Sequence, residues 1–194
     1  DKGGIKVMGW WSVGARHMFT KDKEIRSIND VQGMKIRVME MPVLTEIFKG
    51  LGMLPTPLPY SEVYSALATG VVDAAENDPS GYKNMKFYEV APNYSLTYHL
   101  AYPKLIAMNP KFYNELPDDL KQVVDEVFAE AEEYQRQMFV EIMDKELEDL
   151  KAAGANIIED VDVDSFRSKA QELWKTAPGV DQDLLQRVQE LLQQ

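Results

Sequence analysis

The hydrophobic pattern of residues 35–52 predicts a strand followed by a short helix. Residues 35–39, KIRVM, alternate polar and apolar side chains as a half-buried strand does. Pro42 suits the first position of a helix, because the backbone donor that it lacks is unused there. Apolar side chains then recur on one helical face until Gly52 ends the helix, at Val43, Leu44, Ile47, Phe48 and Leu51.

A second strand is predicted at residues 71–77, VVDAAEN, which are mostly apolar, as in a strand covered on both faces. Before it, Ser61 offers an N-cap side chain and Gly70 ends a helix over residues 62–69. The prolines in residues 54–60, LPTPLPY, remove backbone donors, so we interpret this segment as an extended connector and not as a central strand. Residues 35–77 therefore predict a parallel βαβ unit and an α/β fold.

A long helix is predicted between Pro117 and Ala153, because no glycine or further proline interrupts these residues and Gly154 supplies the stop. At about 1.5 Å per residue it would run to roughly 55 Å, well beyond the ~30 Å that matches a small domain. We therefore expect this helix to bend or to span two lobes. A short strand at residues 155–160, a helix near 164–175 and a terminal amphipathic helix from residue 181 complete the pattern.

Charge and composition narrow the classes of partner. The net charge of −11 repels phosphate backbones and anionic lipid surfaces, so nucleic acid is not an expected partner. The chain has no cysteine, which excludes disulfides, thiolate metal sites and thiol catalysis. His17 and His99 lie far apart without other ligands at a metal-binding spacing, so we expect structural roles for both, with no metal site and no cofactor.

Arg37 is unusual, because an arginine within a half-buried strand needs a partner. One interpretation is a surface ion pair with Glu40 or Glu76. The other follows from the position of Arg37 and Asn77 late in two strands of one βαβ unit, since open α/β sheets bind ligands beyond the carboxyl ends of their strands. A guanidinium fork matches a carboxylate, and an asparagine amide can add a donor beside it. Together they would form an anion receptor.

Four segments, in this order and spacing, carry a family resemblance: GMKIRVMEMPV at 33–43, PTPLPYSEVYSALATGVVDAAEN at 55–77, KFYEVAPNYSLTYH at 86–99 and NELPDDLKQVVDEVFAEAEEYQ at 114–135. Over nearly its whole length the chain resembles the solute-binding subunit of tripartite ATP-independent periplasmic (TRAP) transporters, the C4-dicarboxylate-binding-protein-like family. The resemblance implies a two-lobed α/β periplasmic protein. Such a protein captures an organic acid between its lobes and hands it to membrane permease subunits.

The resemblance also implies roles for particular residues. The arginine of the KIRV strand, Arg37, would bind the ligand carboxylate, with Arg16 and Asn77 as supporting contacts. Where many relatives read ENP or ENNP, this chain reads ENDPSG, so Asp78 would bring an acid near the site, better suited to a hydroxyl than to a second carboxylate. Relatives also carry a further segment before residue 4, which forms most of the other lobe. The chain has no initiator methionine, and we expect its natural start to lie upstream.

Two further residues complete the set of candidates. Trp10 and Trp11 point to opposite faces of an alternating segment, so at most one faces the cleft, and we favour Trp11 as a surface for a sugar ring. Glu40 lies close after Arg37 and is the other addition. The predicted ligand-binding residues are thus Arg37, Arg16, Asn77, Glu40, Asp78 and Trp11.

We predict two regions: residues 1–104 as an α/β ligand-binding lobe with hinge strands, and residues 105–194 as the lobe-spanning helix and C-terminal helices that complete the lobes. The predicted function is binding without chemistry, in the periplasm. One alternative is an enzyme acting on a hydroxy or sugar acid, with Glu40, Glu76 or Asp78 as general base. The other is an isolated lobe without activity of its own.

Overall fold

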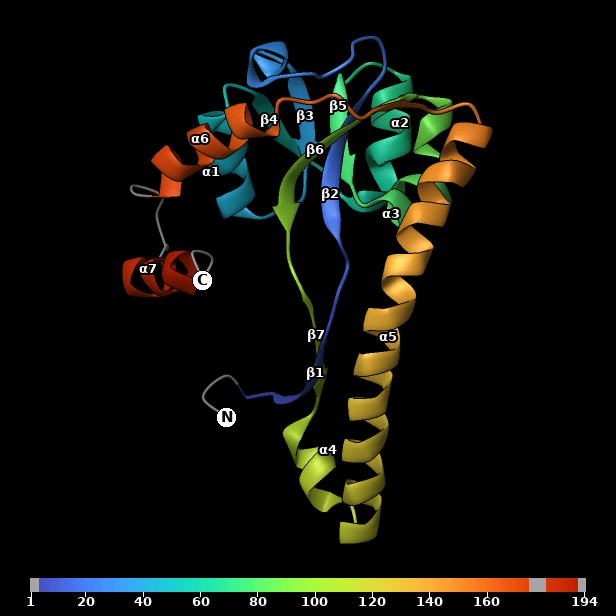
Figure 1. Ribbon diagram of the computed structural model, residues 1–194, viewed down its shortest axis with the longest axis vertical. Coiled ribbons are helices and arrows are strands. Elements are labelled where there is room, and N and C mark those ends of the chain that lie inside the picture. The colour runs from blue at the N-terminus through green and yellow to red at the C-terminus, as the bar shows by residue number, and fades with distance from the viewer. Residues whose placement is uncertain (1–3, 175–180, 192–194) are drawn as a thin grey trace.

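A six-stranded mixed sheet forms the upper part of the molecule, and a two-stranded ladder continues it downward (Figure 1). The computed structural model describes residues 4–174 and 181–191. The order of the six strands is β4-β3-β5-β2-β6-β8, and the ladder pairs β1 with β7. The strands are β1 Lys6–Trp11, β2 Ala15–Thr20, β3 Lys35–Val38, β4 Leu54–Pro57, β5 Ala74–Asn77, β6 Asn93–Ala101, β7 Lys104–Met108 and β8 Asn156–Ile158.

Helices cover both faces of the large sheet. The α-helices are α1 Pro42–Gly50, α2 Val63–Ala68, α3 Pro79–Asn84, α4 Pro110–Glu115, α5 Asp118–Ala152, α6 Val163–Trp174 and α7 Gln182–Leu191. Short 3-10 turns are η1 Ile28–Val31, η2 Tyr60–Glu62 and η3 Phe87–Glu89. Successive residues of β2 point to opposite faces, so Phe19 packs in the core under α2, α3 and the end of α5, while Met18 packs in the core under α1 and α6. The alternation of the sequence thus builds two cores on one sheet.

The predicted parallel unit is confirmed, with one correction. β3 and β5 are parallel neighbours, with Ile36 opposite Ala74. The interpretation of residues 54–60 as a connector is wrong in part, because residues 54–57 form β4, which pairs in parallel with β3. β4 is an edge strand, where a proline that lacks a donor loses no ladder bond on the solvent side. The predicted exclusion of a central strand therefore stands.

Two local boundaries differ from the prediction. Ser61 does not cap α2: it lies inside η2, and the residue at the N-cap of α2 is Glu62, without a side-chain cap. β5 begins at Ala74 and not at Val71, because the amides of Val71 and Val72 bond to the carbonyl of Ala66 and close the end of α2. Backbone bonds to the preceding helix here outweigh the strand preference of two valines.

The long helix is confirmed as α5, which runs from the sheet to the two-stranded ladder (Figure 1). Near its middle, Glu132 accepts from the amide of Trp10 at 3.0 Å, and Gln135 bonds both the amide and the carbonyl of Ser12. β8, α6 and α7 confirm the last three predicted elements, although residues 175–180 lie outside the described ranges. The predicted division near residue 104 falls at the first residue of β7 and stays a prediction.

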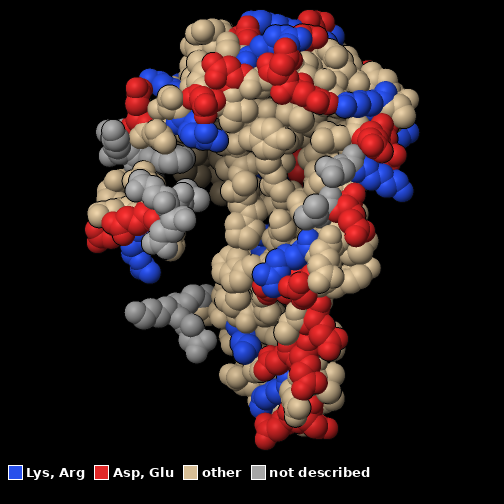
Figure 2. Space-filling view, viewed as in Figure 1, with Lys and Arg blue, Asp and Glu red and all other residues tan. Residues whose placement is uncertain are grey.

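None of the helices in the described ranges is both long and apolar enough to cross a membrane. Acidic side chains instead gather along the lower part of α5 in Figure 2. This surface accounts for part of the strong negative charge of the chain.

An apolar row on α5 should make this chain associate. Leu120, Val123 and Val127 recur at helical spacing and are 47%, 53% and 54% exposed. Contiguous exposed apolar side chains of this kind mark surfaces that bind other protein surfaces. We expect concentration-dependent light scattering and binding of an apolar dye, and both should fall in a Val123→Lys, Val127→Lys variant.

The matched control adds the same charge to polar positions of α5, as Gln122→Lys with Gln137→Lys, and should leave scattering and dye binding close to those of the unmodified chain. A strictly monomeric chain that binds no dye would show that this row does not mediate association.

Candidate functional site

A polar cavity of about 400 Å³ lies at the carboxyl ends of β3 and β5. Arg37 is the third residue of β3 and Asn77 the last of β5, and both line the cavity. β2 runs antiparallel to β5, with His17 opposite Asn77, so the start of β2 brings Arg16 to the same edge. Asp78 follows Asn77 and also lines the cavity. Four of the predicted residues therefore meet in one place.

Arg37 is buried and forms no ion pair with an acidic side chain of the described residues. The residue as a whole is only 3% exposed. Its Nε and Nη2 donate to the carbonyl of Leu58 at 2.9 and 2.6 Å. Neither Glu40 nor Glu76 forms the ion pair that one interpretation offered; Glu76 bonds to Arg16 instead. Burial lowers the pKa of Arg37, but an arginine in a protein stays protonated. The guanidinium is thus a buried positive charge whose Nη1 is not used by any hydrogen bond to the described residues.

Arg16 and Glu76 form a buried ion pair beneath the cavity. Arg16 Nη2 donates to Glu76 Oε1 and to the Glu76 carbonyl, each at 2.9 Å, and Nε contacts the second carboxylate oxygen. Nη1 faces the cavity, 3.6 Å from Asp78 Oδ2 and 3.4 Å from the Tyr102 hydroxyl. Burial lowers the pKa of Arg16, but the bonds and charge of Glu76 outweigh this effect and raise it. Only one nitrogen of Arg16 is therefore left to meet a ligand.

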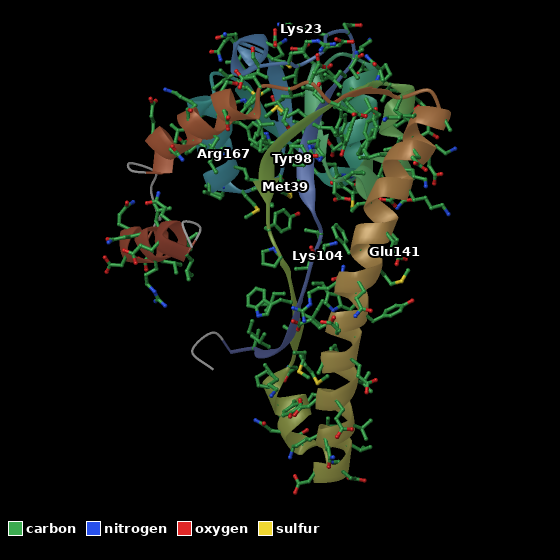
Figure 3. All side chains as sticks on the ribbon, in the orientation of Figure 1. Lys23, Met39, Tyr98, Lys104, Glu141 and Arg167 are labelled. Carbon is green, nitrogen blue, oxygen red and sulfur yellow. The ribbon has the colours of Figure 1, made fainter. Side chains whose placement is uncertain are left out.

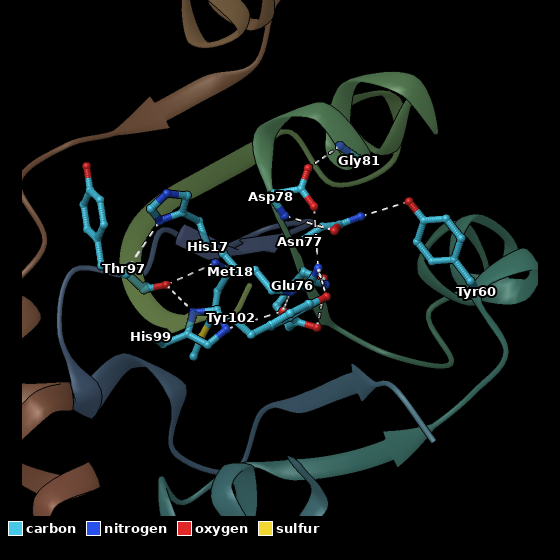
Figure 4. A network of polar contacts seen from close by, with 12 residues as sticks. His17, Met18, Tyr60, Glu76, Asn77, Asp78, Gly81, Thr97, His99 and Tyr102 are labelled. Atoms are coloured by element: carbon cyan, nitrogen blue, oxygen red, sulfur yellow. Dashed lines mark hydrogen bonds and ion pairs between the residues drawn. The ribbon is translucent and has the colours of Figure 1, made fainter. Parts of the chain in front are cut away.

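Hydrogen bonds fix the side chains of Asn77 and Asp78 in position (Figure 4). Asn77 Oδ1 accepts from the Asp78 amide at 3.0 Å, and Asn77 Nδ2 donates to the Tyr60 hydroxyl at 2.9 Å. Asp78 caps α3, because its Oδ1 accepts from the Gly81 amide at 2.8 Å. A side chain at Gly81 would collide with the Asn77 amide, so glycine is required for this packing. Asp78 thus caps α3 with Oδ1, while its other oxygen, Oδ2, lies on the cavity side near Arg16.

The two histidines lie next to the buried ion pair. His99 Nδ1 bonds Thr97 Oγ1 at 2.8 Å, and its Nε2 lies 3.6 Å from Glu76 Oε2. His17 Nδ1 accepts from the Tyr98 amide at 3.2 Å, and burial, together with the neighbouring His99, lowers the pKa of His17 to about 3. Within the described ranges, no group of three or more His, Cys, Asp or Glu side chains is placed to hold a metal ion. Both histidine rings therefore form hydrogen bonds to residues of β6.

Trp11 and Glu40 lie apart from the central group. Trp11 lines an adjoining hollow of about 200 Å³ that shares Asp78 and Lys104 with the main cavity. Its Nε1 is buried and has no hydrogen-bond partner within the described ranges. Figure 3 places Lys104 below the six-stranded sheet and near α5. Glu40 is exposed and does not line either cavity. The ligand-binding roles of all six residues stay predictions.

Tyr60 and Lys104 are among the lining residues that sequence reasoning missed. Tyr60 follows β4 closely, at the carboxyl end of a strand parallel to β3. The rule that located Arg37 and Asn77 would have located Tyr60 as well, had residues 54–57 been recognised as an edge strand. Lys104 begins β7, whose pairing with β1 depends on residues far apart in sequence, and no local pattern marked it.

Comparison with known proteins identifies the family of this chain. Residues 1–178 match the family model described as bacterial extracellular solute-binding protein, family 7. The chain belongs to family 7. This family consists of solute-binding proteins, which confirms the predicted resemblance and the expectation that the chain is not an enzyme.

The similar proteins include curated sequences and solved structures, and the solved structures share the fold. A solute-binding protein of Sulfitobacter sp. strain NAS-14.1 is 40% identical over 138 residues, which cover 71% of this chain and 42% of that protein. A TRAP periplasmic solute-binding protein from Chromohalobacter salexigens, with bound D-glucuronate, superposes with a TM-score of 0.89 at 31% identity, over 97% of this chain and 63% of that one. One from Actinobacillus succinogenes, with bound L-galactonate, gives 0.87 at 28% identity, over 97% and 63%.

Two consequences follow from these family 7 relatives. The periplasmic location expected from the sequence is the one that the names of the related structures give. The chain spans about half the length of the curated relatives it matches and about three fifths of the solved ones. The α/β periplasmic-binding-protein fold is confirmed for this part.

The pH dependence of stability should report on Glu76. Burial alone would raise the pKa of Glu76, but the His99 ring and the Arg16 guanidinium lower it to about 2. A carboxylate with a lowered pKa stabilises the fold fully above its unfolded value, about 4.5, and this contribution is lost as the pH falls toward 2. Between pH 6 and pH 3 the free energy of unfolding should therefore fall by about 2 kcal/mol through Glu76.

Urea unfolding at a series of pH values checks this, with Glu76→Gln as the test and the exposed Glu126→Gln as the control. Glu76→Gln should destabilise the protein by about 3–5 kcal/mol at pH 7, because it leaves Arg16 buried without its anion, and should show a shallower pH dependence. An unchanged slope in Glu76→Gln would mean that this carboxylate is not ionised in the fold.

Proposed function

We propose that the protein carrying this chain binds a sugar acid reversibly, with the ligand carboxylate on Arg37, as the solute-binding subunit of a TRAP transporter. The single observation that carries the proposal is the buried guanidinium of Arg37, which has no acidic partner among the described residues. A buried charge without a counter-ion is costly, and an incoming carboxylate would supply one.

The geometry of Arg37 favours a carboxylate over a single-atom anion. The carbonyl of Leu58 takes the Nε and Nη2 side of the guanidinium. The second hydrogen of Nη2 points away from Leu58, parallel to one hydrogen of Nη1. This remaining end presents two parallel N–H donors, the arrangement that binds the two oxygens of a carboxylate.

The charges around the cavity favour an acid with one carboxylate. Arg37, Arg16 and Lys104 line the cavity as cations, Asp78 lines it as an acid, and Glu76 lies directly behind Arg16. Three positive and two negative charges leave one positive charge, which one carboxylate neutralises. A second carboxylate would have to approach Asp78, where like charges repel.

The remaining lining groups suit hydroxyl groups. Asp78 offers an acceptor oxygen beside Arg16, and Trp11 lines the adjoining hollow. The main cavity of about 400 Å³ lies within the range of ligand sites, about 300–1,000 Å³. The related proteins that hold D-glucuronate and L-galactonate add support for a sugar acid. Delivery to membrane permease subunits is proposed from the TRAP relatives alone.

A thermal-shift screen of organic acids, followed by mass spectrometry, tests the function. We expect sugar acids to raise the melting temperature, since ligand at a thousandfold excess over Kd stabilises by about 4 kcal/mol. Each acid is tested up to millimolar concentration, so that a weak complex is also detected. The bound acid should be released chemically unchanged. A product that differs from the added acid would support an enzyme instead, and the absence of any shift would count against binding.

Substitution of Arg37 should remove most of the affinity for an acid found in this screen. We expect Arg37→Ala to weaken binding by at least about a hundredfold, because two charge-assisted hydrogen bonds of roughly 1.5 kcal/mol or more are lost. Arg37→Lys should restore only part of it, because an ammonium group cannot offer a planar fork. Calorimetric titration measures these affinities, and Arg187→Ala, on the exposed α7, is the control.

Arg16→Ala and Asn77→Ala should weaken binding less than Arg37→Ala, because they contribute supporting contacts. If either variant were the weakest binder, the carboxylate contact would have to be reassigned to that residue. Unfolding of each variant is measured in parallel, because Arg16→Ala also leaves Glu76 buried without its partner.

A further inference from the structure

Tyr60 lies at the rim of the cavity, beside Arg37. It opens η2 directly after Pro59, and its side chain lines the cavity while the residue stays 43% exposed. The centre of its ring is 5.8 Å from Cζ of Arg37, so the aromatic face lies over the guanidinium. Its hydroxyl contacts Asn77, which lines the same cavity. The hydroxyl of Tyr60 is therefore close to the position at which a carboxylate would meet Arg37.

The bond between Asn77 and Tyr60 can run in only one direction. The Asp78 amide lies 3.0 Å from one end of the Asn77 side chain, and a backbone N–H can only donate. That end must be the oxygen Oδ1, so the other end, 2.9 Å from the Tyr60 hydroxyl, must be the NH₂ group. An amide NH₂ has no acceptor role. Tyr60 Oη is therefore the acceptor in this bond.

The hydrogen of the Tyr60 hydroxyl remains free to donate elsewhere. Within the described ranges, Tyr60 Oη takes part in one hydrogen bond, the one from Asn77, which uses a lone pair. Burial raises the pKa of Tyr60, so the phenol keeps its proton at neutral pH. Asp78, on the same cavity, can only accept when ionised. The two groups thus offer opposite hydrogen-bonding roles to a ligand, with Tyr60 as the donor.

Resting on the proposed function, we propose that the Tyr60 hydroxyl donates a hydrogen bond to an oxygen on the carbon next to the ligand carboxylate. Uronates carry the ring oxygen on that carbon, aldonates a hydroxyl and 2-oxo acids a carbonyl. Acids with only a methylene at this position would leave the hydroxyl of Tyr60 without an acceptor, which costs affinity. Tyr60 is then a specificity-determining residue, which distinguishes acids by this oxygen and not by the carboxylate.

Two pairs of acids isolate this oxygen. The first pair is D-glucuronate and its carbocyclic analogue, in which a methylene replaces the ring oxygen, and the second is L-galactonate and 2-deoxy-L-galactonate. We expect the unmodified protein to prefer the parent acid about tenfold, the size that one hydrogen bond gives. In Tyr60→Phe this preference should fall to about twofold or less, because the ring and its contact with Arg37 remain while the donor is lost.

Tyr64→Phe is the matched control. Tyr64 lies one helical turn further along, and its hydroxyl donates to Glu89 at 2.9 Å, outside the lining of the cavity. It should keep the full preference for the parent acids. The ratio of the two affinities is the readout, because any loss of order at Asn77 in Tyr60→Phe affects both members of a pair alike.

The outcomes separate this inference from the proposed function. Binding of a parent acid with an unchanged preference in Tyr60→Phe overturns the role of Tyr60 and leaves the proposed function intact. Failure of both parent acids to bind the unmodified protein overturns the sugar-acid function and, with it, this inference. Loss of the preference in Tyr60→Phe, with the preference kept in Tyr64→Phe, supports both.

Discussion

Two buried guanidinium groups share the neighbourhood of one buried carboxylate at the edge of the six-stranded sheet. Glu76 neutralises Arg16, while the guanidinium of Arg37 donates hydrogen bonds to the Leu58 carbonyl alone among the described residues. The charge of Arg16 also adds to the difficulty of burying Arg37. Such an arrangement is costly, and the apolar cores on both faces of the sheet offset it. A carboxylate that binds Arg37 would balance the charge without a rearrangement of the sheet.

The polar groups around this charge are already fixed in position. Arg37 is held by a backbone carbonyl, and Asn77 is held between the Asp78 amide and the Tyr60 hydroxyl. Asp78 is fixed in turn by its cap on α3. A ligand bound here as proposed would meet groups whose orientation is already set, which would lower the entropy cost of association. The hydrogen bonds that stabilise the local fold also determine which groups donate and which accept in the cavity.

The sheet changes direction beside the same site. The pairing of β2 with β6 shifts register between Arg16 and Met18, and Tyr98 takes a left-handed backbone conformation with φ of 47°. Side chains satisfy the backbone groups that this bulge releases: Thr97 accepts from the Met18 amide, and His17 accepts from the Tyr98 amide. A bulge of this kind bends a strand and increases its twist. Beyond the bulge, the chain connects β2 to β1 and β6 to β7, and this ladder lies along α5 (Figure 1).

The sequence by itself determined those features that depend on neighbours along the chain. Helical spacing and the glycine after Ala153 were enough for α5, and apolar alternation with Pro42 was enough for β3 and α1. The rule for parallel strands was also enough to bring Arg37 and Asn77 to one edge, because it depends only on strand order and direction. These features are local, or follow from a topology with few alternatives.

Only the tertiary structure decided how the charges are paired. Glu76 was as good a partner for Arg37 as for Arg16 in the sequence, and the choice depends on the antiparallel placement of β2 beside β5. Tyr60 entered the site because an edge strand with prolines still pairs with β3. Such choices depend on contacts between residues far apart in the chain, whose energies the local pattern does not contain.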